Sequence, residues 1–270
     1  MSDEIYYDSW KENRDIILEY NQVKLDDAGI VNVLGLAVDN LTRDQSIVKV
    51  MNMIDNKIIS HVIFLNPYKI QKIKFNSDLR LIYSKASMYL TNGAGIQWAA
   101  KMLGSIIKER IPILSFMMDL IRIAEIKEYT IFLVGGKPET VERAFSNIRK
   151  SFPKIRIVGR HGGYFSAARE EAIIEAIQKS EPDIIFVGLG FPKEDQWIYK
   201  LKGELKRGVI IGVGGSIDII SGVIKKAPPF FMTRGLDWFY RIITRPWRIG
   251  RLFMLAIFAI NVIFKRFFKK

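Results

Sequence analysis

The chain of 270 residues has no cysteine and only two histidines, His61 and His161. The absence of cysteine excludes disulfides, cysteine-ligated zinc and thiol catalysis. There is also no D-x-D or H-E-x-x-H motif, so we expect no metal site and no cofactor. His61 opens an apolar segment and is interpreted as structural, whereas His161 ends one and either faces a ligand or belongs to a turn.

Long apolar runs are missing as well. The run at residues 252–264 has thirteen residues and is interrupted by Asn261, whereas a membrane-spanning helix needs about 20. The N-terminal sequence MSDEIYYDSW lacks the basic and then apolar pattern of a signal peptide, so none is expected.

Acidic residues are scarce near the C-terminus. The chain has a net charge of +13, and residues 225–270 carry eleven Lys or Arg against a single acid, Asp237. This imbalance predicts an anionic partner: phospholipid, a diphosphate or nucleic acid. The apolar run within the basic segment favours a helix in the membrane interface. The alternative is a helix docked on the protein's own core.

Apolar strand-like segments alternate with amphipathic segments from Val31 onward, which predicts an α/β fold: a Rossmann-like parallel sheet with helices on both faces. A basic amphipathic helical appendage is expected to follow it. We expect an N-terminal extension (1–30), the Rossmann-like domain (31–228) and a membrane-associating appendage (229–270). Strands with their turns are expected at 31–38, 61–65, 87–90, 129–136, 154–160, 183–190 and 208–215, and helices at 42–54, 67–83, 94–103, 113–126, 138–151, 167–179, from 192 and after 215.

Glycines follow four of these strands. Ligands bind beyond the carboxyl ends of parallel strands, where glycine lets backbone N–H groups approach phosphates. A site for a nucleotide or nucleotide-sugar diphosphate is therefore predicted, although no turn has the G-x-G-x-x-G or Walker pattern. The glycines are Gly93, Gly95, Gly135, Gly136, Gly188, Gly190, Gly212, Gly214 and Gly215.

Three polar side chains are further candidates. Asn92, in TNGAG, occupies a position suited to a general base but cannot take a proton. Asp218, in GGSID, either caps a helix or binds a sugar or ribose hydroxyl. Arg110 pairs either with phosphate or with a carboxylate.

Arginines recur every three or four residues in the basic segment. On a helix such residues share one face, and guanidinium groups bind phosphates in a bidentate manner. A diphosphate is thus a fitting partner for Arg241, Arg245, Arg248 and Arg251.

Four stretches resemble the WecG/TagA/CpsF family of bacterial glycosyltransferases: VGRHGGYF (158–165), VGLGFPKEDQWI (187–198), GVGGSIDIISGVIKKAP (212–228) and GLDWFYRIITRPWR (235–248). The resemblance covers about residues 31–252. It implies inverting, metal-independent transfer of a sugar, often of the N-acetylmannosamine type, from a UDP-sugar. The implied acceptor is a polyprenyl-diphosphate-linked sugar at the cytoplasmic face of the membrane, and the products are polysaccharides such as teichoic acid or capsule.

The resemblance also implies roles for residues. Arg241, Arg248 and Arg251 match arginines that the family's appendage brings to the active site, and with Asn92 and Asp195 they are the catalytic candidates. The substrate-binding candidates are Asn66, Gly93, Gly95, Arg110, Gly135, Gly136, His161, Gly188, Gly190, Pro192, Lys193, Glu194, Gly214, Gly215 and Asp218.

The chain departs from the family pattern in four places. Asn92 stands where the family's D-G turn has Asp, and Phe64 replaces the Thr of its T-x-N motif. The family's P-K-Q-E motif is P-K-E-D at residues 192–195, and Ser115 replaces the Asp of its G-x-D motif. These changes indicate a divergent subgroup with another sugar or another base.

Several alternatives remain open. In the first, Asn92 binds the sugar while Asp195, Glu194, Asp218 or a substrate phosphate takes the proton. In the second, Asn92 is an engineered or chemically altered form of an Asp. In the third, the protein binds its ligand without turning it over. The last reading describes a noncatalytic membrane-bound sugar-nucleotide-binding protein. An NAD-dependent oxidoreductase is disfavoured by the missing fingerprint, and nucleic-acid binding does not explain the apolar run. A homo-oligomer is left open.

Overall fold

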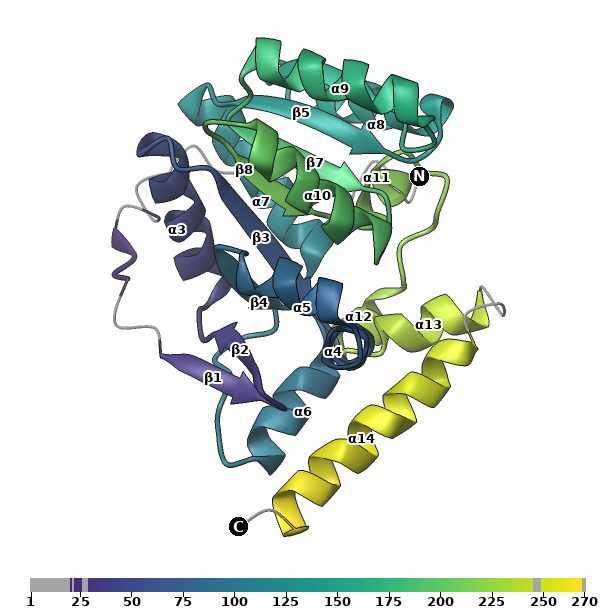
Figure 1. Ribbon diagram of the computed structural model, residues 1–270. Helices are drawn as coiled ribbons and strands as arrows, with labels where there is room; N and C mark the ends of the chain where they lie inside the picture. The colour runs from purple at the N-terminus through teal and green to yellow at the C-terminus, as the bar shows by residue number, and fades with distance from the viewer. Residues whose placement is uncertain (1–19, 21, 26–28, 245–248, 269–270) are drawn as a thin grey trace. The chain divides into compact units, whose positions relative to one another are not determined.

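A computed structural model describes residues 20, 22–25, 29–244 and 249–268 (Figure 1). Most of the expected N-terminal extension lies outside these residues. The expected division into extension, domain and appendage stays a prediction.

The fold class is α/β, as predicted, with a parallel sheet of six strands in the order β4-β3-β8-β7-β5-β6. The strands are β3 (Ser60–Leu65), β4 (Met88–Thr91), β5 (Thr130–Gly135), β6 (Arg156–His161), β7 (Ile184–Gly188) and β8 (Val209–Gly212).

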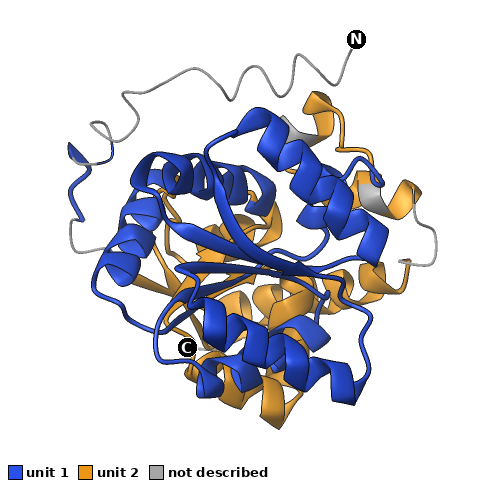
Figure 2. Cartoon of the chain, turned by 90° about the horizontal axis from the view of Figure 1, so that it is seen from above, with its two compact units in different colours: residues 1–26, 44–61, 113–224 blue, residues 27–43, 62–112, 225–270 orange. Residues whose placement is uncertain are grey.

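The chain forms two compact units that alternate along the sequence (Figure 2). Unit 1 contains residues 44–61 and 113–224, together with the described residues before 27. Unit 2 contains residues 29–43, 62–112 and the described residues from 225 onward.

Unit 1 packs helices on both faces of its strands. On one face, α9 (Ala167–Ser180) and α10 (Lys193–Glu204) bury apolar side chains against β5, β7 and β8. On the other, α8 (Pro138–Ser151) contacts β5 and β6, and α11 (Ser216–Ile220) contacts α8 and α7 (Ile113–Lys127). This unit also contains α3 (Arg43–Asp55) apart from its first residue.

The connections that leave β5 and β7 run in opposite directions across the sheet. The connection through α8 leads outward to β6, and the connection through α9 leads back past β5 to β7. Two right-handed connections in opposite directions place their helices on opposite faces. A crevice for ligands forms at such a reversal, beyond the carboxyl ends of the strands. In unit 1 this is the end of β5 and β7.

Unit 2 combines β4 and most of β3 with a two-stranded hairpin and several helices. Buried residues of α6, such as Ile96, and of α4, such as Ile70, form part of its core. Its remaining elements are β1 (Ile30–Val33), β2 (Leu36–Asp39), α4 (Pro67–Lys74), α5 (Ser77–Ser84), α6 (Ala94–Met102), α12 (Pro229–Thr233), α13 (Asp237–Ile243) and α14 (Gly250–Phe268).

The single strand expected at 31–38 is wrong, because the segment forms the antiparallel hairpin of β1 and β2. Its two-residue turn has positive φ at Leu34 (55°) and Gly35 (94°), which a two-residue hairpin of this kind requires. The Asn32 side chain accepts a hydrogen bond from the Gly35 N–H at 2.8 Å. Because Leu34 is apolar, the sequence shows an uninterrupted apolar run and gives no sign of the chain reversal at this turn.

The single helix expected at 67–83 is also wrong, because it is divided into α4 and α5. The Asn76 side chain accepts a hydrogen bond from the Leu79 N–H at 2.8 Å and so caps a new helix. The other expected strands and helices are present, with ends shifted by at most a few residues.

The predicted C-terminal helix is confirmed as α14, which packs on α4 and α6 within unit 2. Phe258 and Val262 are buried in this contact. Asn261, the polar residue of the apolar run, donates from its Nδ2 to Oε1 of the fully buried Gln71 of α4 at 3.2 Å. Across the described part of the chain, no helix combines the length and the apolar character needed to cross a membrane.

Replacing Asn261 by Ala should lower the free energy of unfolding by about 1–3 kcal/mol, because it leaves the buried Gln71 oxygen without this donor. The double variant Gln71→Leu/Asn261→Leu should be close to wild type, since both polar partners are then removed. Urea midpoints of the three proteins measure this. A loss in the double variant as large as that in Asn261→Ala would contradict a coupled pair.

Candidate active site

The carboxyl ends of β5, β7 and β8 approach one another closely in unit 1. A Cβ atom on Gly135 would lie 2.6 Å from the Gly188 carbonyl oxygen, and one on Gly188 would lie 2.7 Å from the Gly214 carbonyl oxygen. Real Cβ atoms do not approach backbone so closely. Gly135 and Gly188 are therefore required by contact between neighbouring turns, whereas Gly214 has open space around a Cβ and a positive φ of 53°.

The turn after β6 joins the same group. The Gly163 N–H donates to the Gly136 carbonyl at 2.7 Å, and a Cβ on Gly163 would lie 3.1 Å from Cα of Gly135. The structure thus brings together four turns whose glycines lie beyond strand ends. We call Gly135, Gly136, Gly163, Gly188 and Gly214 the glycine cluster.

Glu194 connects two of these turns. Its side chain is 3% exposed, and Oε2 accepts hydrogen bonds from the N–H groups of Gly190 at 3.2 Å and Gly214 at 2.9 Å. Glu194 follows the exposed Pro192 and Lys193 at the start of α10. Two backbone donors at the strand ends are thereby already used by a carboxylate.

Asp195, the next residue, points into the protein. It is buried, and its Oδ1 lies 3.9 Å from Nε2 of His61, which is buried as well. A general base must reach a substrate hydroxyl. The catalytic role predicted for Asp195 stays a prediction, and the structural interpretation of His61 agrees with its burial.

Asp218 lies over the glycine cluster. Its Oδ1 is 3.3 Å from the position of a Cβ on Gly136, and its Oδ2 is 3.5 Å from that on Gly215. Gly215 occupies the N-cap position of α11, so Asp218 does not. The half-buried carboxylate thus remains the candidate for binding a hydroxyl.

His161 and Tyr164 lie at the end of β6 and in the turn after it. The His161 Nδ1 is 2.7 Å from the Gly162 carbonyl oxygen, and Arg169 Nε donates to His161 Nε2 at 3.4 Å. The next aromatic residue, Tyr164, is 82% exposed beside Gly163. No motif in the sequence points to Tyr164, although an exposed ring next to a glycine turn is suited to stacking on a planar base.

Unit 2 brings two asparagine turns together. β3 and β4 pair so that Leu65 lies opposite Thr91, and Asn66 and Asn92 are the next residues. The Asn92 N–H donates to the Leu65 carbonyl at 2.9 Å, and a Cβ on Gly95 would lie 2.7 Å from Cγ of Pro67. The Asn66 side chain caps α4 by accepting from the Lys69 N–H at 2.9 Å. Gly93 is the N-cap of α6.

The start of the C-terminal segment contacts the second asparagine turn. Gly235, buried and with φ of 69°, lies so close to Ala94 that a Cβ there would be 2.7 Å from the Ala94 Cβ and 3.8 Å from Nη1 of Arg110. Arg110 precedes Ile111, whose N–H donates to the Thr91 carbonyl at 2.7 Å. Asn92, Arg110 and the segment leading to the arginines are thus neighbours within unit 2.

Two of the four arginines of the basic segment lie on separate helices in the structure, Arg241 on α13 and Arg251 on α14. Arg251 lies in the first turn of α14, with its guanidinium carbon 5.2 Å from the centre of the Tyr68 ring. Arg241 belongs to α13. Arg245 and Arg248 lie outside the described residues.

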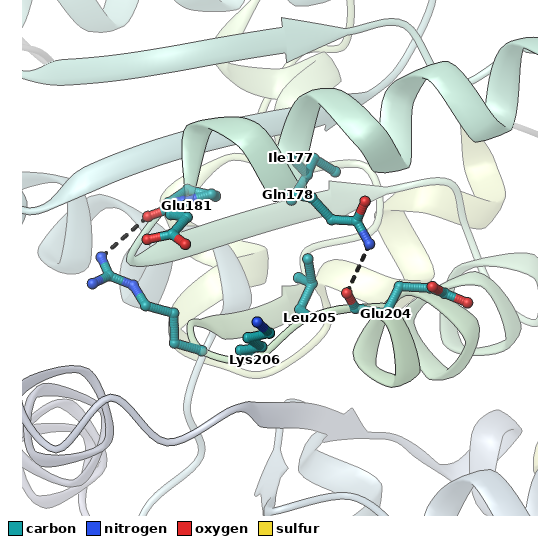
Figure 3. Close-up of a pocket in the computed structure, with 8 residues that line it drawn as sticks. Ile177, Gln178, Glu181, Glu204, Leu205 and Lys206 are labelled. Atoms are coloured by element: carbon teal, nitrogen blue, oxygen red, sulfur yellow. Dashed lines mark hydrogen bonds between the residues drawn. The ribbon is translucent and has the colours of Figure 1, made fainter.

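A cavity of about 260 Å³ lies at the other end of the strands (Figure 3). It is lined by residues that precede β7 and β8, including Glu181, Lys206 and Arg207. Arg207 Nη2 donates to the Glu181 carbonyl at 3.1 Å and to Asp183 Oδ1 at 2.7 Å. This cavity is remote from the carboxyl ends where parallel sheets bind ligands. Among the described side chains, no group of three or more His, Asp or Glu is placed to hold a metal ion.

A parallel sheet with glycine turns gathered at its carboxyl ends is typical of α/β proteins that bind ligands beyond these strand ends. Residues 31–270 match the model of the Glycosyl transferase WecG/TagA/CpsF family, and the chain belongs to this family. It is therefore a glycosyltransferase, and the resemblance found in its sequence is confirmed.

The chain is similar to enzymes of Staphylococcus aureus named N-acetylglucosaminyldiphosphoundecaprenol N-acetyl-beta-D-mannosaminyltransferase. It is 30% identical to the protein of strain NCTC 8325 / PS 47 over 234 residues, which cover 86% of this chain and 91% of the relative. It is 29% identical to the protein of strain MRSA252 over the same length and the same shares of both chains.

Replacing Gly188 by Ala should lower the free energy of unfolding by about 1–3 kcal/mol, because the new Cβ meets the Gly214 carbonyl oxygen. Gly203→Ala is the matched control. Gly203 lies in α10 with no neighbour within 4 Å of a new Cβ, so alanine should raise the free energy by about 0.5–1 kcal/mol. Urea midpoints that move together in both variants would contradict this account.

Proposed function

We propose that this glycosyltransferase transfers an N-acetylmannosamine-type sugar, with inversion, from a UDP-sugar to a polyprenyl-diphosphate-linked N-acetylglucosamine. Membership of the family and the names of the staphylococcal relatives support the sugar and the acceptor. The observation that carries the proposal is the junction of Asn92, Arg110 and Gly235 in unit 2, because it joins the turn where a base is expected to the start of the basic segment.

The reaction forms one bond and breaks one bond. The acceptor hydroxyl attacks the anomeric carbon on the face opposite UDP, and the bond from that carbon to the diphosphate oxygen breaks. Arg241, Arg248 and Arg251 are the proposed partners of diphosphate charge, since guanidinium groups stabilise phosphate oxygens. The glycine cluster and Asp218 are the proposed site of the donor's nucleoside.

The proton of the acceptor hydroxyl needs a destination other than Asn92. The Asn92 amide donates and accepts hydrogen bonds but cannot take the proton, so its proposed role is to orient the sugar. Glu194 and Asp195 are both buried. Glu194 accepts hydrogen bonds from backbone N–H groups of two turns, and Asp195 lies near His61. Asp218 is the most exposed of the three carboxylates, but it is assigned to the donor's nucleoside. The departing diphosphate is therefore the proposed proton acceptor.

We also propose that the protein is peripheral at the cytoplasmic face of the membrane, held by α14. The surface of α14 opposite Phe258 exposes Phe253, Ile260, Phe264 and Phe267, and its last turn carries Lys265 and Arg266. An apolar face edged by cations suits the interface of a bilayer with anionic lipids.

UDP release tests the reaction. Purified wild type, given UDP-N-acetylmannosamine and a short polyprenyl-diphosphate-N-acetylglucosamine, should release UDP. Asn92→Asp should release it at a similar rate, because the proposed proton acceptor is another group. A rate about 10²–10⁴-fold faster would mean that Asn92 stands in the place of a missing base. Asn76→Asp is the matched control, because Asn76 caps α5 and Asp caps equally well; its rate should equal wild type.

The outcomes separate the two functions. Equal rates for wild type and Asn92→Asp would mean that another group is the base. If neither protein releases UDP but UDP still binds in calorimetry, a different sugar or acceptor is favoured first. The noncatalytic binding protein, which the absence of an acid at position 92 supports, is favoured second.

Phe264→Ser/Phe267→Ser should weaken binding to phosphatidylglycerol vesicles at least tenfold, because each exposed ring contributes about 1.5–3 kcal/mol on burial. Their exposed fractions are 61% and 70%. Phe75→Ser is the control, since Phe75 is 70% exposed but belongs to the end of α4 and not to α14. Vesicle sedimentation measures both. Equal binding by wild type and the double variant would place the anchor elsewhere.

A further inference from the structure

Glu194 occupies backbone donors that glycine turns commonly offer to phosphates. The N–H groups of Gly190 and Gly214 belong to the turns after β7 and β8, and both donate to the same carboxylate oxygen. Glycine turns and helix N-termini bind phosphates through such donors. Here an acid from the protein's own chain takes that place.

The surrounding backbone is shaped to hold this carboxylate. A Cβ on Gly212, the last residue of β8, would lie 2.6 Å from Oε1 of Glu194 and 3.2 Å from its carboxyl carbon. The absence of a side chain at position 212 therefore makes room for the acid. With 3% of its surface exposed, the Glu194 side chain is held in position rather than extended into solvent.

Two carboxylates lie at these turns. Glu194 joins the turns after β7 and β8, and Asp218 lies over Gly136 in the turn after β5. A phosphate placed beside Gly190 or Gly214 would meet like charge and would find their N–H groups engaged. Neutral hydroxyl groups meet no such repulsion, and they donate readily to carboxylates.

We propose that Glu194 is a specificity-determining residue that excludes phosphate from the turns after β7 and β8. This part of unit 1 then takes the uncharged, hydroxyl-bearing portion of the donor, and the diphosphate is bound by other groups. The inference rests on the proposed function, because it requires a nucleotide-sugar donor.

Glu194→Gln separates charge from shape. Glutamine keeps an oxygen that accepts the two N–H bonds and removes the negative charge. Calorimetric titration of the full chain with uridine, UMP and UDP is the measurement. UDP should bind about tenfold more tightly to the variant, as expected for loss of one charge near a phosphate, and UMP should gain less. Uridine should bind as it does to wild type.

Two further variants complete the test. Glu204→Gln removes the same charge from the exposed last turn of the same helix and should leave all three affinities unchanged. Glu194→Ala removes the charge and the bridge between the turns. It should also raise the ratio of UDP affinity to uridine affinity, even if it lowers stability, because a general loss of structure weakens both ligands.

The outcomes are distinct. A raised UDP-to-uridine ratio in both Glu194 variants supports the inference. An unchanged or lower ratio, with UDP bound by wild type, overturns it and leaves the proposed function standing. Failure of wild type and variants alike to bind UDP overturns both, because the donor on which the inference rests is then wrong.

Discussion

The close contact between backbone atoms at the ends of β5, β7 and β8 determines the local chemistry of unit 1. A Cβ atom on Gly135 would collide with the Gly188 carbonyl oxygen, and a Cβ atom on Gly188 would collide with the Gly214 carbonyl oxygen. With no side chains between them, the turns approach closely enough for one carboxylate, Glu194, to bind two of them at once. The glycines therefore allow the turns to pack against one another. A ligand at these turns would find some of the backbone N–H groups already hydrogen-bonded to Glu194.

Unit 2 depends on a different interaction, the amide pair of Asn261 and Gln71. Most of the contact between α14 and α4 is apolar and would tolerate rotation of the helix, because apolar packing is not directional. A buried amide pair is directional and fixes which residues face inward. One helix can then present Phe258 and Val262 to the protein and Phe264 and Phe267 to its surroundings.

Much of the fold could be predicted from the sequence because its strands and helices alternate with clear periodicity. The two errors, at 31–38 and 67–83, lie where a local signal was hidden: Leu34 in a hairpin turn and Asn76 within an amphipathic run. The site was less accessible. The glycines and Asp218 could be identified from turn positions, but the bonds of Glu194 depend on amides that meet only in the folded chain. The exposure of Tyr164 has no counterpart in local sequence, and Arg248 lies outside the described residues.

The pairing of Asn261 with Gln71 limits which insertions α14 can accept without losing its contacts. Successive residues of an α-helix are rotated by about 100°. A single residue inserted between 250 and 260 would turn Asn261 and everything after it relative to the preceding residues, so that either the amide pair or the position of Arg251 over Tyr68 would be lost. Insertions of about a full turn preserve both directions better. The segment between these two contacts is thus constrained in length, whereas residues after Val262 carry no such constraint from this pair.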